Sequence, residues 1–405
     1  MSSRTRTSSA RRRSAAGRLW GVDAARGLAL LGMMTVHVIP TTDFSGEATW
    51  AGLLFSGRSA ALFAVLAGVG LALLTGGSAD ERSSDRLNWD RKVVAVRAVL
   101  IILIGLVLSL LSSGVAIILV HYGVMFVLAL PFLRLGARSL AALAAAWVAI
   151  GPLLYWYWQN ALRETLAPLD HPARLWSSPS PLDLTDPALL GMDLLVTGYY
   201  PLLIWPAYFF AGMAIGRLNL KSVTTAVWLT VAGAATAWVM LLIGRLTMWQ
   251  SDIVVNMAAV SGYSQDRVRG ALTAGDHVLP LVTDPRWFLL STPHQGTPVE
   301  LLHSIGVASA VLGLCLLLAR PFKLLLSPLA GAGSMPLSLY AGHLVILHLW
   351  RPDGAVLNDL SAETLLLILV VAALALGLLK TALGLRGPLE AATYAAGTAV
   401  AGPRP

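Results

Sequence analysis

Apolar runs of about 20 residues recur along this chain, and each is long enough to cross the hydrocarbon layer of a membrane as a helix. One example is LLFSGRSAALFAVLAGVGLALL, residues 53–74. Only 12% of the residues are charged, which is about half the share that soluble proteins carry. The sequence therefore predicts an all-α fold, a polytopic transmembrane helical bundle, and excludes an ordinary soluble domain.

The apolar pattern predicts about ten membrane spans. In order they are 20–39, 53–75, 93–111, 114–133, 139–157, 197–216, 222–244, 301–319, 329–349 and 362–380. The gaps after every second span are basic, with Arg82, Arg86, Arg91, Lys92, Arg134, Arg138, Arg217, Lys221, Arg320 and Lys323. Since cytoplasmic loops carry an excess of Lys and Arg, we expect both termini to be cytoplasmic and the long gaps 158–196 and 245–300 to be outer loops. The same cations explain the net charge of +8, so nucleic acid is not an expected partner.

The two ends of the chain differ from its apolar centre. We expect residues 1–19 to be a disordered, basic cytoplasmic tail and residues 393–405 to be a flexible C-terminal tail. A cleaved signal peptide is the competing interpretation of the N-terminus, but Asp23 and Arg26 interrupt its apolar core. We therefore predict one membrane domain, 20–392, in a multi-pass protein of the cell membrane.

Histidines gather near the predicted outer ends of the spans. They are His37, His121, His294, His303 and His343. Histidine transfers protons near neutral pH, and His343 shares a helix face with Tyr340, three residues before it. For His303 and His348 we favour a structural role at a helix end. No H-E-x-x-H spacing accompanies the histidines and the single cysteine, Cys315, lies mid-span, so no metal site and no disulfide is predicted.

The predicted inner side carries cations instead. Arg91, Lys92 and Arg97 run into the start of the third span, and Arg26 lies near the inner end of the first. The planar fork of arginine suits phosphate recognition. Arg91 and Lys92 can equally be positive-inside anchors, and Arg26 can pair with Asp23, three residues before it. One side thus offers cations for a phosphorylated donor, and the other offers histidines for proton transfer.

Several segments resemble the transmembrane acyltransferase superfamily. They are DAARGLALLGMMTVH and SGRSAALFAVLAG near the N-terminus, YYPLLIWPAYFFAGMAIGR, GAGSMPLSLYAGHLV and the late RGPLEAA. Their order along residues 20–392 is similar to that of heparan-alpha-glucosaminide N-acetyltransferases, YeiB-like membrane proteins and family-three membrane acyltransferases. The resemblance implies a lipid-embedded O- or N-acyltransferase with acetyl-CoA or another acyl-CoA as donor, bound from the cytosol. It implies a glycan or small-molecule acceptor across the membrane, and a homodimer is left open.

The branches of this superfamily place their catalytic histidine differently. In the family-three branch it follows the arginine of an R-G pair, and the corresponding residue here is His37. In the heparan branch it precedes the loop tryptophan, a position that Glu47 holds in this sequence. The resemblance therefore implies acyl transfer as a class and disfavours heparan itself as the acceptor.

Our hypothesis for the chemistry is general-base catalysis. His37, oriented by Glu47 or Asp43, would take the proton of the acceptor. His343 with Tyr340, or Arg58 in their place, would stabilise the oxyanion. The predicted catalytic residues are His37, His343 and Glu47; the substrate-binding residues are Asp43, Arg58, His121, Tyr340 and His294; the donor-binding residues are Arg26, Arg91, Lys92 and Arg97. A covalent acyl-histidine route is left open.

Two other function classes stay open at this point. A transporter or ligand-binding protein would use the histidines as a proton relay, although no internal repeat of the kind found in many transporters is evident. A catalytically inactive family member would bind a partner and do no chemistry. Titration with acyl-CoA separates the enzyme from the transporter.

Overall fold

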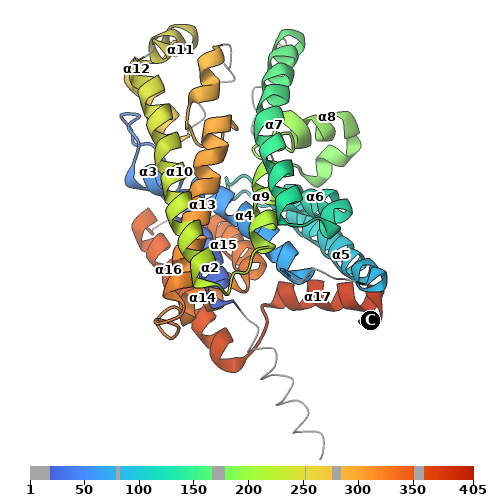
Figure 1. The fold of residues 1–405 in the computed structure, drawn as a ribbon. Helices are drawn as coiled ribbons and strands as arrows, with labels where there is room; N and C mark the ends of the chain where they lie inside the picture. Colours follow the sequence, from blue (N-terminus) through green and yellow to red (C-terminus); the bar gives the residue numbers. More distant parts are fainter. Residues whose placement is uncertain (1–18, 79–82, 167–177, 251, 276–283, 351–359) are drawn as a thin grey trace, which may run out of the picture.

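The computed structural model describes residues 19–78, 83–166, 178–250, 252–275, 284–350 and 360–405, with the backbone alone for 162–166 and 250. This part of the chain is all-helical, as predicted, apart from an isolated bridge between Thr42 and Ala48 (Figure 1). Its elements are α2 (Trp20–Val38), α3 (Trp50–Phe55), α4 (Arg58–Leu74), α5 (Ser84–Leu108), α6 (Leu119–Ala129), η1 (Leu130–Arg134), α7 (Ala137–Leu166), η3 (Pro181–Thr185), α8 (Pro187–Met192), η4 (Asp193–Thr197), α9 (Pro206–Gly216), α10 (Val223–Gln250), α11 (Ile253–Ser261), α12 (Gln265–Ala274), η5 (Pro285–Leu289), α13 (Pro298–Leu318), α14 (Ser327–Gly333), α15 (Pro336–Trp350), α16 (Ala362–Leu383) and α17 (Pro388–Ala401).

Five helical stretches among the described residues are long and apolar enough to cross a membrane. They are Trp50–Leu74, which joins α3 and α4, Ala137–Ala161 in α7, Val223–Trp249 in α10, and the helices α13 and α16. Helices α14 and α15 together make a sixth, although they are bent by 83°. The chain is therefore a multi-pass membrane protein, while the ten-span topology and the cytoplasmic termini stay predictions.

Two of the predicted spans are interrupted at a proline. The sequence predicts one span over 197–216, but the α-helix there begins only at Pro206. The predicted span 329–349 divides into α14 and α15, and Pro336 begins α15. Proline lacks the N–H donor of a helix interior and suits the first helical position. Both interruptions lie beside residues that line the cavities described below.

The two predicted outer loops contain several helices. Helices α7 and α10 continue into the ranges 158–196 and 245–300, where α8, α11 and α12 also form. Polar residues such as Arg267 on α12 lower the mean hydropathy of these segments, so a search for apolar spans does not find them. The indole Nε1 of buried Trp287 in η5 donates to Oε1 of Gln295, 3.3 Å away, and this bond helps to order the second loop.

Helix α17 corrects the prediction of a flexible tail at 393–405. Thr393 and Gly397 of this helix are buried, and α17 packs along α5 at the foot of the bundle (Figure 1). The indole Nε1 of Trp89 on α5 donates to the carbonyl of Gly402, 2.9 Å away. Small residues allow two helices to approach closely, which is why this Ala- and Gly-rich segment docks.

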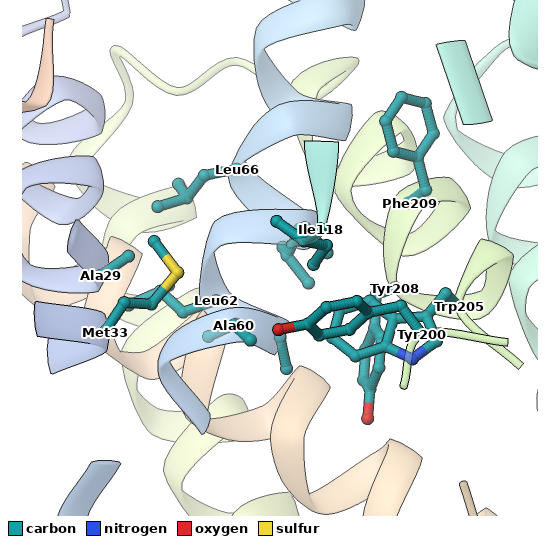
Figure 2. Close-up of a cluster of buried hydrophobic side chains, with 14 of the residues drawn as sticks. Ala29, Met33, Ala60, Leu62, Leu66, Ile118, Tyr200, Trp205, Tyr208 and Phe209 are labelled. Atoms are coloured by element: carbon teal, nitrogen blue, oxygen red, sulfur yellow. The ribbon is translucent and has the colours of Figure 1, made fainter. Parts of the chain in front are cut away.

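Helix α2 lies within the bundle and packs against α4, α13 and α14. Met33 of α2, Leu66 of α4 and Phe209 of α9 belong to the same buried cluster (Figure 2). Gly212 of α9 faces Val65 of α4 so closely that a Cβ atom would clash with the carbonyl of Val65. This close packing joins α9 to α4, the helix against which α2 packs.

Candidate active site

Two histidines from distant parts of the chain meet at the centre of the candidate site. Nδ1 of His37, near the end of α2, lies 3.0 Å from Nε2 of His343 on α15. The two ring planes are nearly parallel, inclined by 6°, and their centroids are 5.2 Å apart. One nitrogen must carry the hydrogen that the other accepts, so the pair can hold a shared proton. Among the described residues, no group of three or more His, Cys, Asp or Glu side chains could hold a metal ion.

A cavity of about 630 Å³ lies beside His37, and we call it the histidine cavity. Its wall carries the rings of Tyr199, Tyr200, His294 and Tyr340. Hydroxyl-bearing residues complete the polar part of the wall; they are Thr41, Thr42, Ser56, Ser59, Ser109 and Ser178. A wall of rings and hydroxyls suits a ligand that both stacks and hydrogen-bonds.

A second cavity of about 290 Å³, the arginine cavity, is lined by Arg26 of α2 and Arg97 of α5. Tyr122 of α6 and Glu390 of α17 also line it. Tyr340 is part of the wall of both cavities. Its side chain is buried, and its hydroxyl lies beside the backbone of Ile118. Tyr340 is therefore the point at which the two cavities adjoin.

The two arginines of the arginine cavity differ in their pairing. Nη1 of Arg26 lies 3.2 Å from Oδ1 of Asp23, and its Nη2 donates to the carbonyl of Leu66 at 3.4 Å. Arg26 is thus a paired residue that also faces the cavity. Nε of Arg97 is buried without a hydrogen-bond partner among the described residues, so Arg97 keeps a donor for a ligand.

Two further predicted histidines lie around the tyrosines of the histidine cavity. His294 is in the cavity wall, with its ring centroid 4.6 Å from that of Tyr199, and has a backbone φ of +62°. Residues other than glycine rarely adopt this φ, and it often marks functional loops. His121 is fully buried and packs edge-on against Tyr200, with centroids 5.7 Å apart. His294 can therefore touch a ligand, whereas His121 supports the wall.

Asp43 and Glu47 lie in the exposed loop between α2 and α3. Oδ1 of Asp43 accepts hydrogen bonds from the backbone N–H groups of Ser45 and Glu47, both at 2.9 Å, and from the Ser45 hydroxyl at 2.5 Å. The hydroxyl of Ser45 lowers the pKa of Asp43. Neither acid lines the histidine cavity. Asp43 instead stabilises the conformation of its own loop, and Glu47 lies outside the site.

Three predicted cations line neither cavity. Nε of Arg58 donates to Nε2 of His303 at 3.2 Å. This hydrogen bond accounts for the presence of both polar side chains in otherwise apolar helices. Nε of Arg91 donates to the carbonyl of Leu130 at 3.4 Å, and Lys92 is exposed. The structure therefore does not bring Arg58, Arg91 or Lys92 together with the histidine pair.

Three polar residues of this region were not among the predicted site residues. Glu390 and Tyr122 line the arginine cavity, and buried Glu300 lines a small void with His294 and accepts a hydrogen bond from Tyr208 at 2.7 Å. Glu390 belongs to the quoted motif RGPLEAA, but nothing in that motif indicates its partner. A capping pattern, T-x-x-E, marks Glu300 as the start of a helix and not as a buried carboxylate.

The family described as heparan-alpha-glucosaminide N-acetyltransferase, catalytic, matches residues 18–250, which is more than half of the 405 residues. The chain belongs to this family. The match confirms the resemblance that the sequence motifs indicate, and the first three of those motifs lie within the matched range. Within the matched range of this N-acetyltransferase family lie His37, Arg26 and Arg97, whereas Tyr340 and His343 follow it in the sequence. No curated protein matches the chain.

Proposed function

We propose that the chain is a membrane acetyltransferase that takes the acyl group of acyl-CoA in the arginine cavity and passes it to an acceptor in the histidine cavity. The observation that carries the proposal is that Tyr340 lines both cavities. A thioester that reaches Tyr340 lies close to the histidine pair, because the ring centroids of Tyr340 and His343 are 5.1 Å apart. Membership of the N-acetyltransferase family supports acetyl as the group that is moved.

The arginine cavity suits the donor. Arg26 and Arg97 supply positive charge, and arginine binds phosphate oxygens through its planar fork. The remaining wall includes the apolar side chains of Phe63, Leu119 and Phe126. Such a wall fits the uncharged arm that joins the phosphates of CoA to the thioester.

The histidine pair suits base catalysis. The oxygen or nitrogen of the acceptor attacks the thioester carbonyl carbon while His37 takes its proton. The carbon–sulfur bond then breaks, the acyl group stays on the acceptor, and the proton passes from the pair to the leaving sulfur. The protonated ring of His37 is stabilised by donation from Nδ1 to Nε2 of His343, and the hydroxyl of Tyr340 donates to the oxyanion.

The acceptor in this proposal is a glycan or a small molecule with a free hydroxyl or amine. The rings of Tyr199 and His294 and the surrounding hydroxyls of the histidine cavity support that class. The basic segment 1–19 and the cations in alternate gaps support cytoplasmic termini in the cell membrane. We therefore assign the donor to the cytoplasmic side and the acceptor to the opposite side.

Titration of the purified full chain with acetyl-CoA tests the donor half of the proposal. The wild-type chain should bind saturably, and Arg97→Gln should weaken binding. Arg138→Gln makes the same change of charge at an exposed position near the start of α7 and should bind like wild type. Absence of acetyl-CoA binding to the wild-type chain would contradict the proposal.

A transporter with a histidine proton relay is the second candidate function. The 83° bend between α14 and α15 favours it, because many transporters build their sites from discontinuous helices. Such a protein would move protons through His37 and His343 and would have no use for CoA. Proton-coupled solute uptake into vesicles, together with no acetyl-CoA binding, would favour this function over the enzyme.

A further inference from the structure

The carboxylate of Glu390 on α17 holds the first turn of α15. Its Oε1 accepts hydrogen bonds from the backbone N–H groups of Leu337 and Ser338, at 2.7 and 3.2 Å. Its Oε2 accepts from the hydroxyl of Ser338 at 2.5 Å. The N-terminus of a helix carries a partial positive charge and unpaired N–H groups. Glu390 is therefore an anion bound at a helix N-terminus.

The same carboxylate lies in the wall of the arginine cavity. Arg26, Arg97, Leu337 and Glu390 all line this cavity, so two guanidinium groups and the start of α15 face one space. A helix N-terminus together with arginine side chains is a recurrent arrangement for binding phosphate groups. In this structure the donors at the start of α15 are taken by a carboxylate of the chain itself.

Further donors in this cavity have no partner. The hydroxyl of Tyr122, whose side chain is 2% exposed, makes no hydrogen bond with the described residues, and neither does Nε of Arg97. Buried polar groups are nearly always hydrogen-bonded. Their presence in the wall beside Glu390 indicates a ligand with several acceptor oxygens, which a single carboxylate only partly replaces.

We propose that the start of α15, Arg26 and Arg97 form a binding site for a phosphate ester, and that Glu390 occupies it as an internal anion which the phosphate displaces. The inference rests on the proposed function in one respect, which is that the phosphate belongs to the acyl-CoA donor. A phosphate group carries more negative charge and more acceptor oxygens than a carboxylate. It therefore competes for the donors of Leu337 and Ser338 and adds bonds to Arg97.

If Glu390 were only a cap of helix α15, removal of its charge would not strengthen anion binding, whereas a competing anion predicts that it does. If Glu390 only stabilises α15, then Glu390→Gln lowers stability and leaves anion binding unchanged or weaker. If Glu390 is a competitor, the same substitution strengthens anion binding, because a like charge leaves the site. Gln keeps the shape and an acceptor oxygen, so the fold has the best chance of surviving the change.

The experiment uses the full chain in detergent and inorganic pyrophosphate as the probe, with the dissociation constant measured by calorimetry. Glu390→Gln should bind pyrophosphate about tenfold more tightly than wild type, which corresponds to about 1.4 kcal/mol. Glu363→Gln, the same charge change in the exposed first turn of α16, should bind like wild type. An unchanged or weaker affinity in Glu390→Gln would overturn the proposal.

A second variant covers the case in which Glu390→Gln does not fold. Arg97→Gln should weaken pyrophosphate binding, and Arg138→Gln should not; equal affinities in both would overturn the site. Phosphatidic acid in mixed micelles forms a further arm, and tightening in Glu390→Gln for this lipid alone would overturn the assignment to a soluble donor. Pyrophosphate binding requires no acyl transfer, so a tightened site without transferase activity would refute the proposed function and leave the site standing.

Discussion

Nδ1 of His37 lies 3.0 Å from Nε2 of His343 and the two ring planes are nearly parallel, although 306 positions separate the residues. His37 lines the histidine cavity, whereas His343 is 2% exposed and is not part of its wall. In our proposal His343 therefore acts on the acceptor through His37. It takes the orienting role that the sequence suggested for Glu47 or Asp43.

Substitution of the buried histidine tests this division of roles. His343→Ala should lower kcat for acetyl transfer by about tenfold or more, less than the loss of the base itself, with little change in KM for acetyl-CoA. Because the two rings act as a unit, adding His343→Ala to His37→Ala should cause no further loss. Steady-state kinetics in membranes measure both values. Additive losses in the double variant would argue against the pair.

Tyr340→Phe should separate catalysis from stability. No side chain of the described residues pairs with the hydroxyl of Tyr340, which lies beside the backbone of Ile118, so its removal should change the unfolding temperature little. Loss of an oxyanion donor should lower kcat by about 100-fold. Thermal unfolding and transferase assays on the same preparation provide the comparison. Full activity in this variant would remove Tyr340 from the mechanism.

Arg58→Gln should act on stability. Arg58 donates to Nε2 of His303, whose Nδ1 lies 2.8 Å from the carbonyl of Ala237, so the substitution disrupts a chain of contacts between α4, α13 and α10. We expect a lower unfolding temperature, as for other losses of buried polar contacts. An unchanged unfolding temperature with lost transfer would instead return Arg58 to the substrate site.

The ion pairs at the start of η5 should be sensitive to acid. Arg286 contacts Asp284 at 2.5 Å and Asp252 at 3.0 Å, and the hydrogen bond from its side chain lowers the pKa of Asp284. A carboxyl group whose pKa is lowered in the folded state stabilises the fold at pH values above its unfolded pKa of about 3.9. This stabilisation is lost as the pH falls through the folded pKa.

The unfolding temperature of Asp284→Asn should therefore lie below that of wild type near neutral pH. The difference should shrink below about pH 4, where the wild-type carboxylate takes up a proton. Glu47→Gln, in the exposed loop between α2 and α3, serves as the control and should match wild type throughout. A difference that persists unchanged in acid would show that charge is not its cause.

Sequence patterns could predict the helices and the histidines, because apolar runs and polar interruptions are local features. The placement of His37 and His343 near the same end of their spans puts both at a similar depth, which permits their contact but does not specify it. Proline suits the first position of a helix, yet the hydropathy pattern joins the residues on either side of Pro336 into one span, 329–349. The pattern of 393–405 looked like a tail because small residues carry little hydropathy signal, although they suit close packing on α5.

The rest of the site depends on contacts between distant segments. Nothing local in the sequence tells that Glu390 reaches the start of α15, or that Arg58 turns to His303 and not to the histidine cavity. Glu47 was assigned by a family position, and the structure places that residue in an exposed loop. Side chains at a correct depth can face several neighbours, and only the packing of the helices selects one.

The most direct test of the account is acetyl transfer from labelled acetyl-CoA by membranes that contain His37→Ala, measured beside acetyl-CoA binding by the same variant. Binding should be retained, because His37 is not part of the arginine cavity, and transfer should fall by about 100-fold or more with the loss of a general base. Transfer at the wild-type rate in this variant would contradict it.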